Sequence, residues 1–329
     1  MTASWRPDPM RAFVTGGTGF LGRPLLRELL AHGYAITALV RTYERARQLP
    51  AGVRAVPGDI TKPATLRPGL RDADIVFHLA ALTTVGVQPR DQARMERINV
   101  EGARNVLTAA AEAGIGRLVH VSSVAVYGDT HGRILDETAP ASGVFETHAQ
   151  RTKHAAHFTV AAGLQAQGAP LIIACLGALY GPEGQAGVGR LLAWQARGRL
   201  PMMLGPAGAR AWTYVDDAAA GLRLAAEHGQ AGETYHLAGP GHTMRELLET
   251  AARLGRTSAP ALWLPGGLAA QAARGLSRLR PAWAEQLRAL AGVTYLARAD
   301  KAAHALGWTG RPVAAGLPPT LTWLKEILP

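Results

Sequence analysis

The sequence contains a single cysteine, Cys175, among its 329 residues. One cysteine excludes an internal disulfide and any metal site built from several thiolates, and it fits a reducing compartment, so we expect a cytoplasmic protein. Histidine and carboxylate residues form no cluster at metal-ligand spacing, and we expect no metal centre. A G-x-S-x-G nucleophile elbow is also missing, which argues against acyl hydrolysis.

Long hydrophobic runs are missing as well. No apolar stretch reaches the ~18 residues that a membrane-spanning helix needs. Residues 1–10 lack the apolar core of a signal peptide, and we expect them to form a disordered leader. Zinc spacings, RNP-like aromatic motifs and long Lys/Arg runs are missing, so we expect no nucleic-acid partner despite the net charge of +11. That charge reflects either an arginine-rich composition or attraction for an anionic ligand such as a phosphorylated cofactor.

Strand-like and helix-like segments alternate along the first half of the chain. This alternation, with Gly, Asp or Ser after the strands, is typical of a doubly wound parallel α/β sheet that binds ligands at its carboxyl ends. The predicted strands are 11–15, 35–40, 53–57, 73–79, 117–122 and 171–176, and the main predicted helices run through Leu25–Leu30, 95–113 and 150–162.

The rhythm breaks after residue 180. We therefore predict a Rossmann domain over 11–180 and a smaller mixed α/β substrate lobe over 181–329, interleaved with a last Rossmann strand near 234–238. The stretch 260–290 is rich in Leu and Arg. It is compatible with a lid, a subunit contact or a membrane-surface helix, and we expect a lid or packing helix. A homodimer stays open.

Three glycines, Gly16, Gly19 and Gly22, stand between the first strand and the first helix. Glycine lets the backbone turn tightly and approach a pyrophosphate, which the free N–H groups at the helix start then bind. Because the strand and the amphipathic helix supply the context that this motif requires, we predict a dinucleotide site.

Arg41 follows the second strand, where a carboxylate would bind the ribose diol of NAD. An arginine there favours the 2′-phosphate of NADP instead, so we predict NADP(H) over NAD(H). Arg45, one helical turn on, is placed to add to this charge. Asp59, after the third strand, either accepts a hydrogen bond from the adenine amino group or caps the next segment.

Short motifs follow one another in order along nearly the whole chain: Thr15–Gly22, Gly58-Asp59-Ile60, His78-Leu79-Ala80-Ala81, Asn99-Val100-Glu101-Gly102, Val121-Ser122-Ser123, Val126-Tyr127-Gly128, Tyr180-Gly181-Pro182, Tyr214-Val215-Asp216-Asp217 and Leu306-Gly307-Trp308. Through these motifs the chain resembles the extended, or atypical extended, short-chain dehydrogenase/reductase superfamily and its NAD-dependent epimerase/dehydratase members. The Val40-Arg41 ending looks more like the dihydroflavonol-reductase and hydroxysteroid-dehydrogenase branches.

The resemblance implies roles for particular residues. It implies an NADP(H)-dependent reductase, epimerase or dehydratase that acts on a small carbonyl or hydroxyl substrate. Asn99 would be a buried polar anchor, Ser123 a hydroxyl beside the nicotinamide, and Lys153 the family lysine. The other implied cofactor contacts are Thr18, Gly19, Phe20, Leu21, Asp59, Ile60, Leu79, Ala80 and Ala81.

One position departs from the family pattern. The family uses Tyr-x-x-x-Lys, in which the tyrosine moves a proton to or from the substrate oxygen, but Ala149 stands four residues before Lys153. Three hypotheses stay open. His148 replaces the tyrosine, another group such as Tyr127, Tyr180 or a water does so, or the protein is a non-catalytic NADP(H) sensor or scaffold.

The substrate side gives weaker signals. Arg210 stands where sugar-nucleotide members hold a phosphate, and Tyr127 is a second candidate substrate contact. We expect Asp217 to cap a helix. Apolar residues suggest an apolar substrate pocket: Val85, Phe145, Leu179, Trp194 and Trp212.

Overall fold

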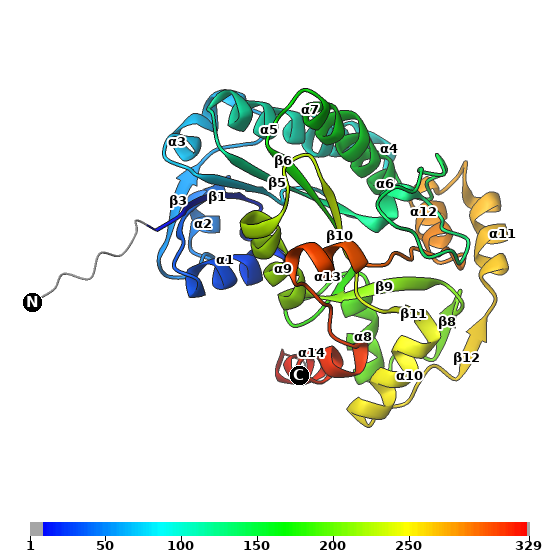
Figure 1. Cartoon of the computed structure of the whole chain (residues 1–329). Helices are drawn as coiled ribbons and strands as arrows, with labels where there is room; N and C mark the ends of the chain where they lie inside the picture. Colours follow the sequence, from blue (N-terminus) through cyan, green and yellow to red (C-terminus); the bar gives the residue numbers. More distant parts are fainter. Residues whose placement is uncertain (1–8, 328–329) are drawn as a thin grey trace, which may run out of the picture.

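A seven-stranded parallel sheet forms the centre of the molecule (Figure 1). The computed structural model describes residues 9–327, so residues 1–8 of the predicted leader lie outside the described residues. The strand order is β10-β6-β5-β4-β1-β2-β3, and every neighbouring pair is parallel. The order reverses between β1 and β4, and ligands of doubly wound folds bind at such a point. The predicted fold class is confirmed.

Four of the six predicted strands of the first half match the structure at both ends. The sheet strands are β1 (Arg11–Thr15), β2 (Ala35–Val40), β3 (Val53–Pro57), β4 (Ile75–His78), β5 (Arg117–Ser123), β6 (Leu171–Leu176) and β10 (Thr234–Leu237). The strand predicted over 73–79 is shorter at both ends, because Ala73 closes the preceding turn and Leu79 bonds to the carbonyl of Thr15 as the chain leaves the sheet.

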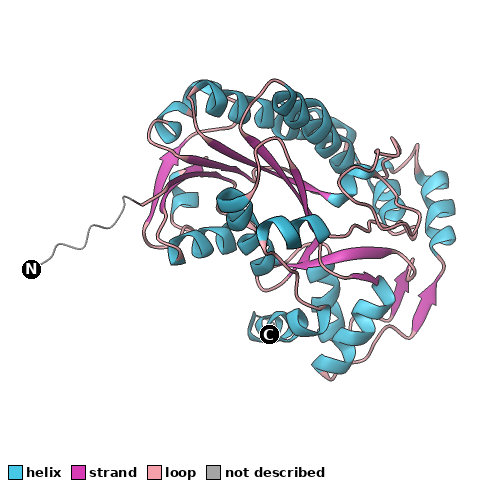
Figure 2. Ribbon diagram, in the orientation of Figure 1, coloured by secondary structure: helices cyan, strands magenta, loops and turns pink. Residues whose placement is uncertain are grey.

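Helices cover both faces of the sheet (Figure 2). One face packs against α1 (Gly22–Ala31), α9 (Val215–His228) and α13 (Asp300–Leu306) through a core that includes Leu25, Leu222 and Leu306. Two of these helices come from the stretch 181–329, whose assignment to a separate lobe stays a prediction. Short elements at the edge of the sheet are α2 (Tyr43–Ala46), η1 (Pro63–Thr65) and α3 (Arg67–Leu70).

The other face packs against two long interrupted helices. The first comprises α4 (Pro89–Glu96), the π-helical η2 (Arg97–Glu101) and α5 (Gly102–Glu112). The second comprises α6 (His148–His154), the π-helical η4 (Ala155–Ala161) and α7 (Ala162–Ala166). The first helix begins six residues before the predicted start, because Pro89 at the first helical position favours initiation there. Its π-helical turn holds Asn99, and π-bulges often mark functional positions.

A group of smaller sheets and helices, which we call the second lobe, lies under the carboxyl ends of the strands (Figure 1). Its sheets consist of β7 (Ala178–Tyr180), β9 (Ala209–Tyr214) and β11 (Gly241–Thr243), and of β8 (Met202–Leu204) paired with β12 (Leu262–Leu264). Its helices are α8 (Val188–Ala196), α10 (Met244–Gly255), α11 (Gly266–Leu276), α12 (Pro281–Ala289) and α14 (Val313–Ile327). No helix in the described range 9–327 is long and apolar enough to cross a membrane.

The prediction that Asp217 caps a helix is wrong. α9 begins at Val215, so Asp217 lies inside the first turn and the cap residue, Tyr214, makes no side-chain cap bond. The Asp217 carboxylate instead forms a bidentate ion pair with Arg311, at 2.6 and 2.9 Å, which ties α9 to the segment before α14.

Candidate functional site

The glycine loop after β1 forms a cradle that side chains would fill. Gly16 has φ +80°, and a Cβ there would lie 2.8 Å from the backbone nitrogen of Ala80. A Cβ on Gly22 would lie 2.2 Å from the carbonyl oxygen of Gly16. The loop is tightened by a hydrogen bond from Gly19 to Gly16 at 3.0 Å. The backbone of this turn therefore has room only for glycine at positions 16 and 22. The outer side of the turn stays open to a ligand.

The first turn of α1 contains no acidic side chain of its own, although Arg23 in that turn pairs with Glu183 at 2.7 Å. Leu21 is the cap residue of α1 and makes no side-chain cap bond. The free N–H groups and the positive end of the helix dipole suit a pyrophosphate. Thr18 and Phe20 lie in this loop, and Phe20 packs near Gly184. The residues present fit a dinucleotide.

Two arginines follow β2. Arg41 is exposed and has no ion-pair or hydrogen-bond partner within residues 9–327, whereas Arg45 donates to Gln48 at 3.3 Å. Burial alone would raise the pKa of Asp59, but hydrogen bonds from Thr61 and the Arg41 charge lower it below its usual value. Asp59 forms a turn with Thr61 at 2.9 Å and caps no helix, because Lys62 precedes η1. Arg41 is thus an exposed cation near the Asp59 carboxylate, just after the end of β2.

The segment after β4 turns back beside the glycine loop. Leu79 bonds to Thr15, while Ala80 and Ala81 line a small cavity with Lys153. Ile60 has a different place: its side chain is buried against Gly102, in the core between β3 and α5. Its carbonyl accepts from Asn105 at 2.9 Å, so the structure gives Ile60 a packing role.

Asn99 joins three parts of the site. Its amide oxygen accepts from the backbone nitrogen of Leu82 at 2.7 Å, and its amide nitrogen donates to the Leu82 carbonyl and to Thr152 Oγ1, each at 2.8 Å. Thr152 in turn donates to the Ala149 carbonyl at 3.0 Å. Asn99 and Thr152 are both buried, so the network fixes α6 relative to the loop after β4. Sequence reasoning missed Thr152, although its position directly before Lys153 was the available signal.

Lys153 points from α6 toward β5. Its Nζ donates to the Val121 carbonyl at 3.0 Å, and the side chain lines the cavity with His78, Asn99 and His120. Desolvation by burial lowers the pKa of Lys153 to about 8. The ammonium is therefore mostly protonated at neutral pH and is a stronger acid than an ordinary lysine.

Ala149 occupies a small apolar cluster. It is 6% exposed and packs with Val87, Met95 and Leu82. The preceding residue, His148, directs its Nε2 to the carbonyl oxygen of Gln92 on α4 at 3.1 Å. A capping box formed by Thr147 and Gln150 makes the helix start regular, so His148 is not swung into the position of the missing tyrosine, and it does not line the Lys153 cavity.

The other predicted hydroxyl groups, the Ser123 hydroxyl beside the nicotinamide and the two alternative tyrosine proton carriers, each have a partner or a packed position in the structure. Ser123 caps η3 (Val124–Tyr127) by accepting from Ala125 at 3.3 Å. Tyr127 is 2% exposed and its hydroxyl contacts His236 Nε2 at 3.1 Å within the core. Tyr180 is 1% exposed and its hydroxyl lies against Gly316. Neither tyrosine lines the Lys153 cavity.

A row of buried polar side chains was not expected from the sequence. Thr15, His78 and His120 are register partners on β1, β4 and β5, and His78 Nδ1 lies 2.7 Å from Thr15 Oγ1. Further along the same face, Ser122 Oγ lies 2.8 Å from Nδ1 of His157, which comes from η4. The available signal was that these polar residues all fall near the carboxyl ends of otherwise apolar strands.

The second lobe meets α6 through Tyr295. Its hydroxyl accepts a hydrogen bond from Gln150, at 2.5 Å, one turn before Lys153. The Arg210 guanidinium lies 5.7 Å from the Tyr295 ring and 6.0 Å from that of Trp212. Arg210 donates to the Ala289 carbonyl at 3.3 Å and has no carboxylate partner within residues 9–327. Of the predicted apolar pocket, Trp212 is fully buried, whereas Trp194 and Val85 are partly exposed.

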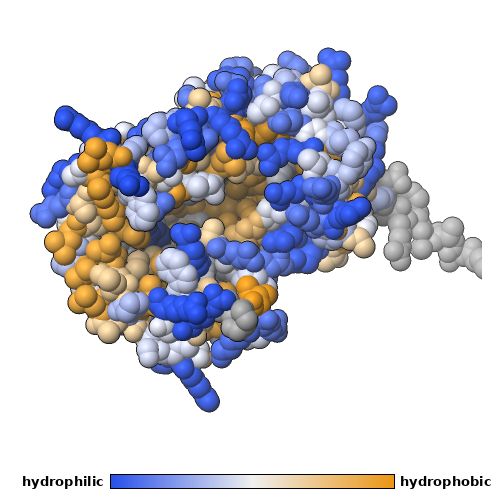
Figure 3. Space-filling model, turned by 180° about the vertical axis from the view of Figure 1, so that it is seen from behind, coloured by the Kyte–Doolittle hydropathy of each residue, from blue (hydrophilic) through white to orange (hydrophobic). Residues whose placement is uncertain are grey.

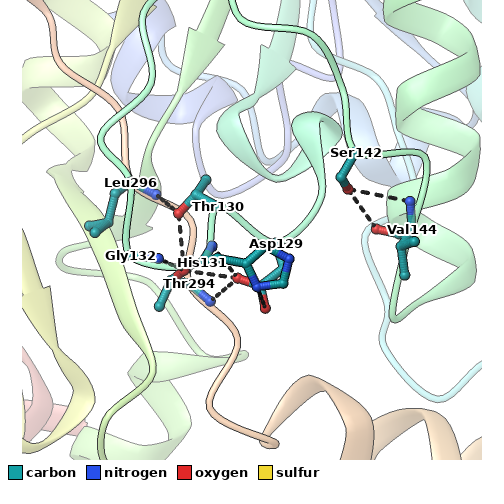
Figure 4. Close-up of polar contacts among 8 residues, drawn as sticks. All are labelled: Asp129, Thr130, His131, Gly132, Ser142, Val144, Thr294 and Leu296. Carbon is teal, nitrogen blue, oxygen red and sulfur yellow. Dashed lines mark hydrogen bonds and ion pairs between the residues drawn. The ribbon is translucent and has the colours of Figure 1, made fainter.

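The segment carrying Tyr295 is fastened to the loop after β5 (Figure 4). Asp129 Oδ1 accepts from the backbone and the hydroxyl of Thr294, at 3.0 and 2.8 Å. Thr130 Oγ1 lies 3.0 Å from Thr294 Oγ1 and accepts from Leu296 at 3.4 Å. Ser142 closes the next turn with Val144. These bonds tie the segment around Tyr295 to the loop that follows β5.

Comparisons with known proteins agree with this geometry. The model of the NAD dependent epimerase/dehydratase family matches residues 12–238. A ketoreductase of Stigmatella aurantiaca that acts on 4-hydroxy-2-methyl-3-oxo-4-farnesyl-3,4-dihydroquinoline-1-oxide is 36% identical over 69% of this chain and 68% of its own.

Two solved structures share the fold over 97% of this chain. One is gox2253, with a TM-score of 0.83, 28% identity and 98% of its own chain covered. The other is a double mutant of DesIV, a dTDP-glucose 4,6-dehydratase from Streptomyces venezuelae with NAD bound, with a TM-score of 0.79, 26% identity and 98% coverage. The chain therefore belongs to the NAD dependent epimerase/dehydratase family, within the extended short-chain dehydrogenase/reductase superfamily, whose members bind NAD(P).

Proposed function

We propose that the chain binds NADP(H) and uses it to reduce a small carbonyl compound, or to oxidise the corresponding hydroxyl compound. The observation that carries this proposal is Lys153, held against the Val121 carbonyl beside Ala80 and Ala81, with the Asn99–Thr152 network intact around it. A protein that no longer used this site would not need so many buried, mutually satisfied polar groups. The ketoreductase relative supports the reductase class over epimerases and dehydratases.

The preference for NADP(H) rests on Arg41. Its guanidinium is exposed, without a partner in the described residues, and close enough to Asp59 to lower the pKa of that carboxyl. A 2′-phosphate would supply the missing anion through charge-assisted hydrogen bonds. Arg45 lies one turn further along and adds to the same positive field. Gly16, Thr18, Gly19, Phe20, Leu21 and Gly22 would surround the pyrophosphate.

The proton required for carbonyl reduction needs a source other than tyrosine. We assign it to the Lys153 ammonium, because burial lowers the pKa of Lys153 to about 8 and a general acid works best near the operating pH. The cofactor supplies the hydride. Ser123 would hydrogen-bond the substrate oxygen, and Arg210 would hold an anionic group on a substrate whose apolar part lies toward Leu179. We also infer a reducing, cytoplasmic setting from the single buried thiol of Cys175.

A second candidate is a non-catalytic NADP(H) sensor or scaffold. The burial of Ala149 against Val87 and Met95 favours it, because an apolar cluster now fills the position from which a phenol would reach the substrate. His148 cannot take the place of a catalytic tyrosine while its ring is hydrogen-bonded to the carbonyl oxygen of Gln92.

A turnover assay separates the two candidates. Oxidation of NADPH would be followed with a panel of ketones, aldehydes and enones for the wild type, Lys153→Met and His148→Ala. The reductase proposal expects turnover that His148→Ala retains and Lys153→Met loses, by about a hundredfold or more. Tight NADPH binding with no turnover on any carbonyl class would support the sensor instead. Turnover that disappears in His148→Ala would instead identify His148 as the proton donor.

A further inference from the structure

An exposed apolar patch covers the outer side of the α11–α12 hairpin and the adjoining edge of the β8–β12 sheet. We define the apolar patch as Met202, Leu262, Leu268, Leu279 and Trp283, whose exposed fractions run from 44% to 81%. Met202 and Leu262 are register partners on the two strands. Figure 3 shows hydrophobic surface gathered at the left edge of this reversed view, where α11, α12 and β12 lie. Contiguous exposed apolar surface of this kind marks an interaction site.

The rim of the apolar patch is cationic. Arg274, Arg278 and Arg280 are exposed and form no ion pair within residues 9–327. Two of them flank Leu279, the most exposed residue of the patch at 81%. The only acidic residue between positions 260 and 292 is Glu285, which is buried and accepts from the backbone of His148 at 3.1 Å. The exposed surface of this segment therefore carries positive charge with no acidic side chain to balance it.

The combination of exposed apolar residues and unpaired arginines indicates which class of partner this surface binds. Leucine and tryptophan beside unpaired arginines are typical of helices that lie in the interface of an anionic bilayer, with apolar side chains at the acyl boundary and arginines at the phosphates. A second copy of the chain would bring the same arginines together and repel. We propose that the α11–α12 hairpin docks the protein on the surface of an anionic phospholipid membrane, without crossing it.

The inner side of the hairpin reaches the candidate site. Glu285 on α12 binds the start of α6, and a Cβ on Gly86 would lie 2.5 Å from the Gln286 side chain, so α12 also contacts the loop after β4. Docking would thus place the approach to Lys153 next to the bilayer, and a lipophilic carbonyl compound would enter from there. This consequence rests on the proposed function, whereas docking itself does not.

Vesicle flotation tests the proposal. The full chain would be mixed with vesicles of phosphatidylcholine alone, and with vesicles in which a minority of the lipid is phosphatidylglycerol. We expect flotation with the anionic vesicles only, reduced by added salt because charge attraction is screened. Leu279→Ala with Trp283→Ala should weaken binding at least about tenfold through lost apolar burial. Replacing Arg274, Arg278 and Arg280 by Gln should weaken it about a hundredfold, at about fivefold per arginine.

Matched controls lie on the opposite part of the molecule. Tyr43 is 80% exposed, and Tyr43→Ala should leave flotation unchanged. Replacing the exposed Arg67, Arg71 and Arg104 by Gln removes the same charge from another face and should cost less than about threefold. Unchanged thermal melting verifies the fold of each variant, and because it needs no cofactor it keeps this test separate from that of the proposed function.

Three results would overturn the proposal. The first is that the wild type does not float with anionic vesicles, and the second is that it floats equally well with neutral vesicles. The third is that the control variants lose as much binding as the variants of the apolar patch. If light scattering then finds a concentration-dependent dimer that Leu279→Ala with Trp283→Ala abolishes, the apolar patch is a contact between copies of this chain. The comparison of wild-type flotation with anionic and with neutral vesicles tests the proposal even where a variant fails to fold.

Discussion

The imidazole rings of His78 and His120 stack on neighbouring strands, with their centroids 5.5 Å apart and their planes inclined by 21°. Both side chains are almost fully buried. Desolvation lowers the pKa of His78 to about 3 and that of His120 well below its usual range. Desolvation also lowers the pKa of His157, which lies on η4 above the same sheet face, to about 3. The folded protein therefore holds three neutral imidazoles beneath the candidate site.

Because of these histidines, we expect the folded protein to lose stability already in mildly acidic solution. The unfolded chain binds protons on them below pH ~6.5, while the folded chain stays unprotonated until much lower pH. The free energy of unfolding is thus fully retained above pH ~6.5 and falls below it, by up to about 1.4 kcal/mol per pH unit for each group. Urea denaturation at several pH values between 7 and 5 measures the slope. His120→Phe should reduce the slope by about a quarter, because the pKa of the buried His236 is lowered as well. A stability that does not change from pH 7 to pH 5 would contradict this picture.

Restoring the family tyrosine is expected to cost stability. In Ala149→Tyr the phenol must enter the space held by Val87 and Met95, and overpacking a core typically costs about 1–3 kcal/mol. The double variant Ala149→Tyr with Val87→Ala should recover most of that loss, and it should gain carbonyl reduction, since a general acid contributes about 10²–10⁴-fold. Thermal melting and NADPH oxidation check both parts, with Val87→Ala alone as the control. An Ala149→Tyr melting point equal to that of the wild type would show that the apolar cluster is not the barrier.

Lys153 predicts how NADPH affinity depends on pH. Burial lowers the pKa of Lys153 to about 8, so raising the pH from 7 to 9 converts most of the ammonium that would bond the nicotinamide ribose into a neutral amine, which is a weaker donor. We expect the affinity to fall by up to about tenfold over this range, the loss of one hydrogen bond to a charged group. Lys153→Met keeps the apolar length of the side chain and should bind NADPH independently of pH there. A wild-type affinity that is flat from pH 7 to 9 would remove Lys153 from the binding site.

The sequence predicted some parts of this molecule well and others poorly, for physical reasons. β1 and β6 were bounded at the correct residues, because buried parallel strands are short apolar runs ended by turn residues. The glycine loop was readable because part of its steric requirement is local: a Cβ on Gly22 would meet the carbonyl oxygen of Gly16. Asp217 was misread because its partner Arg311 is 94 residues away. His148 was ambiguous for the same reason: Gln92 and Glu285 decide its position, and both belong to other elements.

The central claim is that the cradle after β1 binds NADP(H) and that Arg41 reads the 2′-phosphate. Isothermal titration of the wild type, Arg41→Ala and the exposed control Arg67→Ala with NADPH and with NADH tests it most directly. We predict that the wild type and Arg67→Ala bind NADPH about tenfold to a hundredfold more tightly than NADH, and that Arg41→Ala binds the two about equally. Equal affinity of the wild type for the two cofactors, or an undiminished NADPH preference in Arg41→Ala, would contradict the claim.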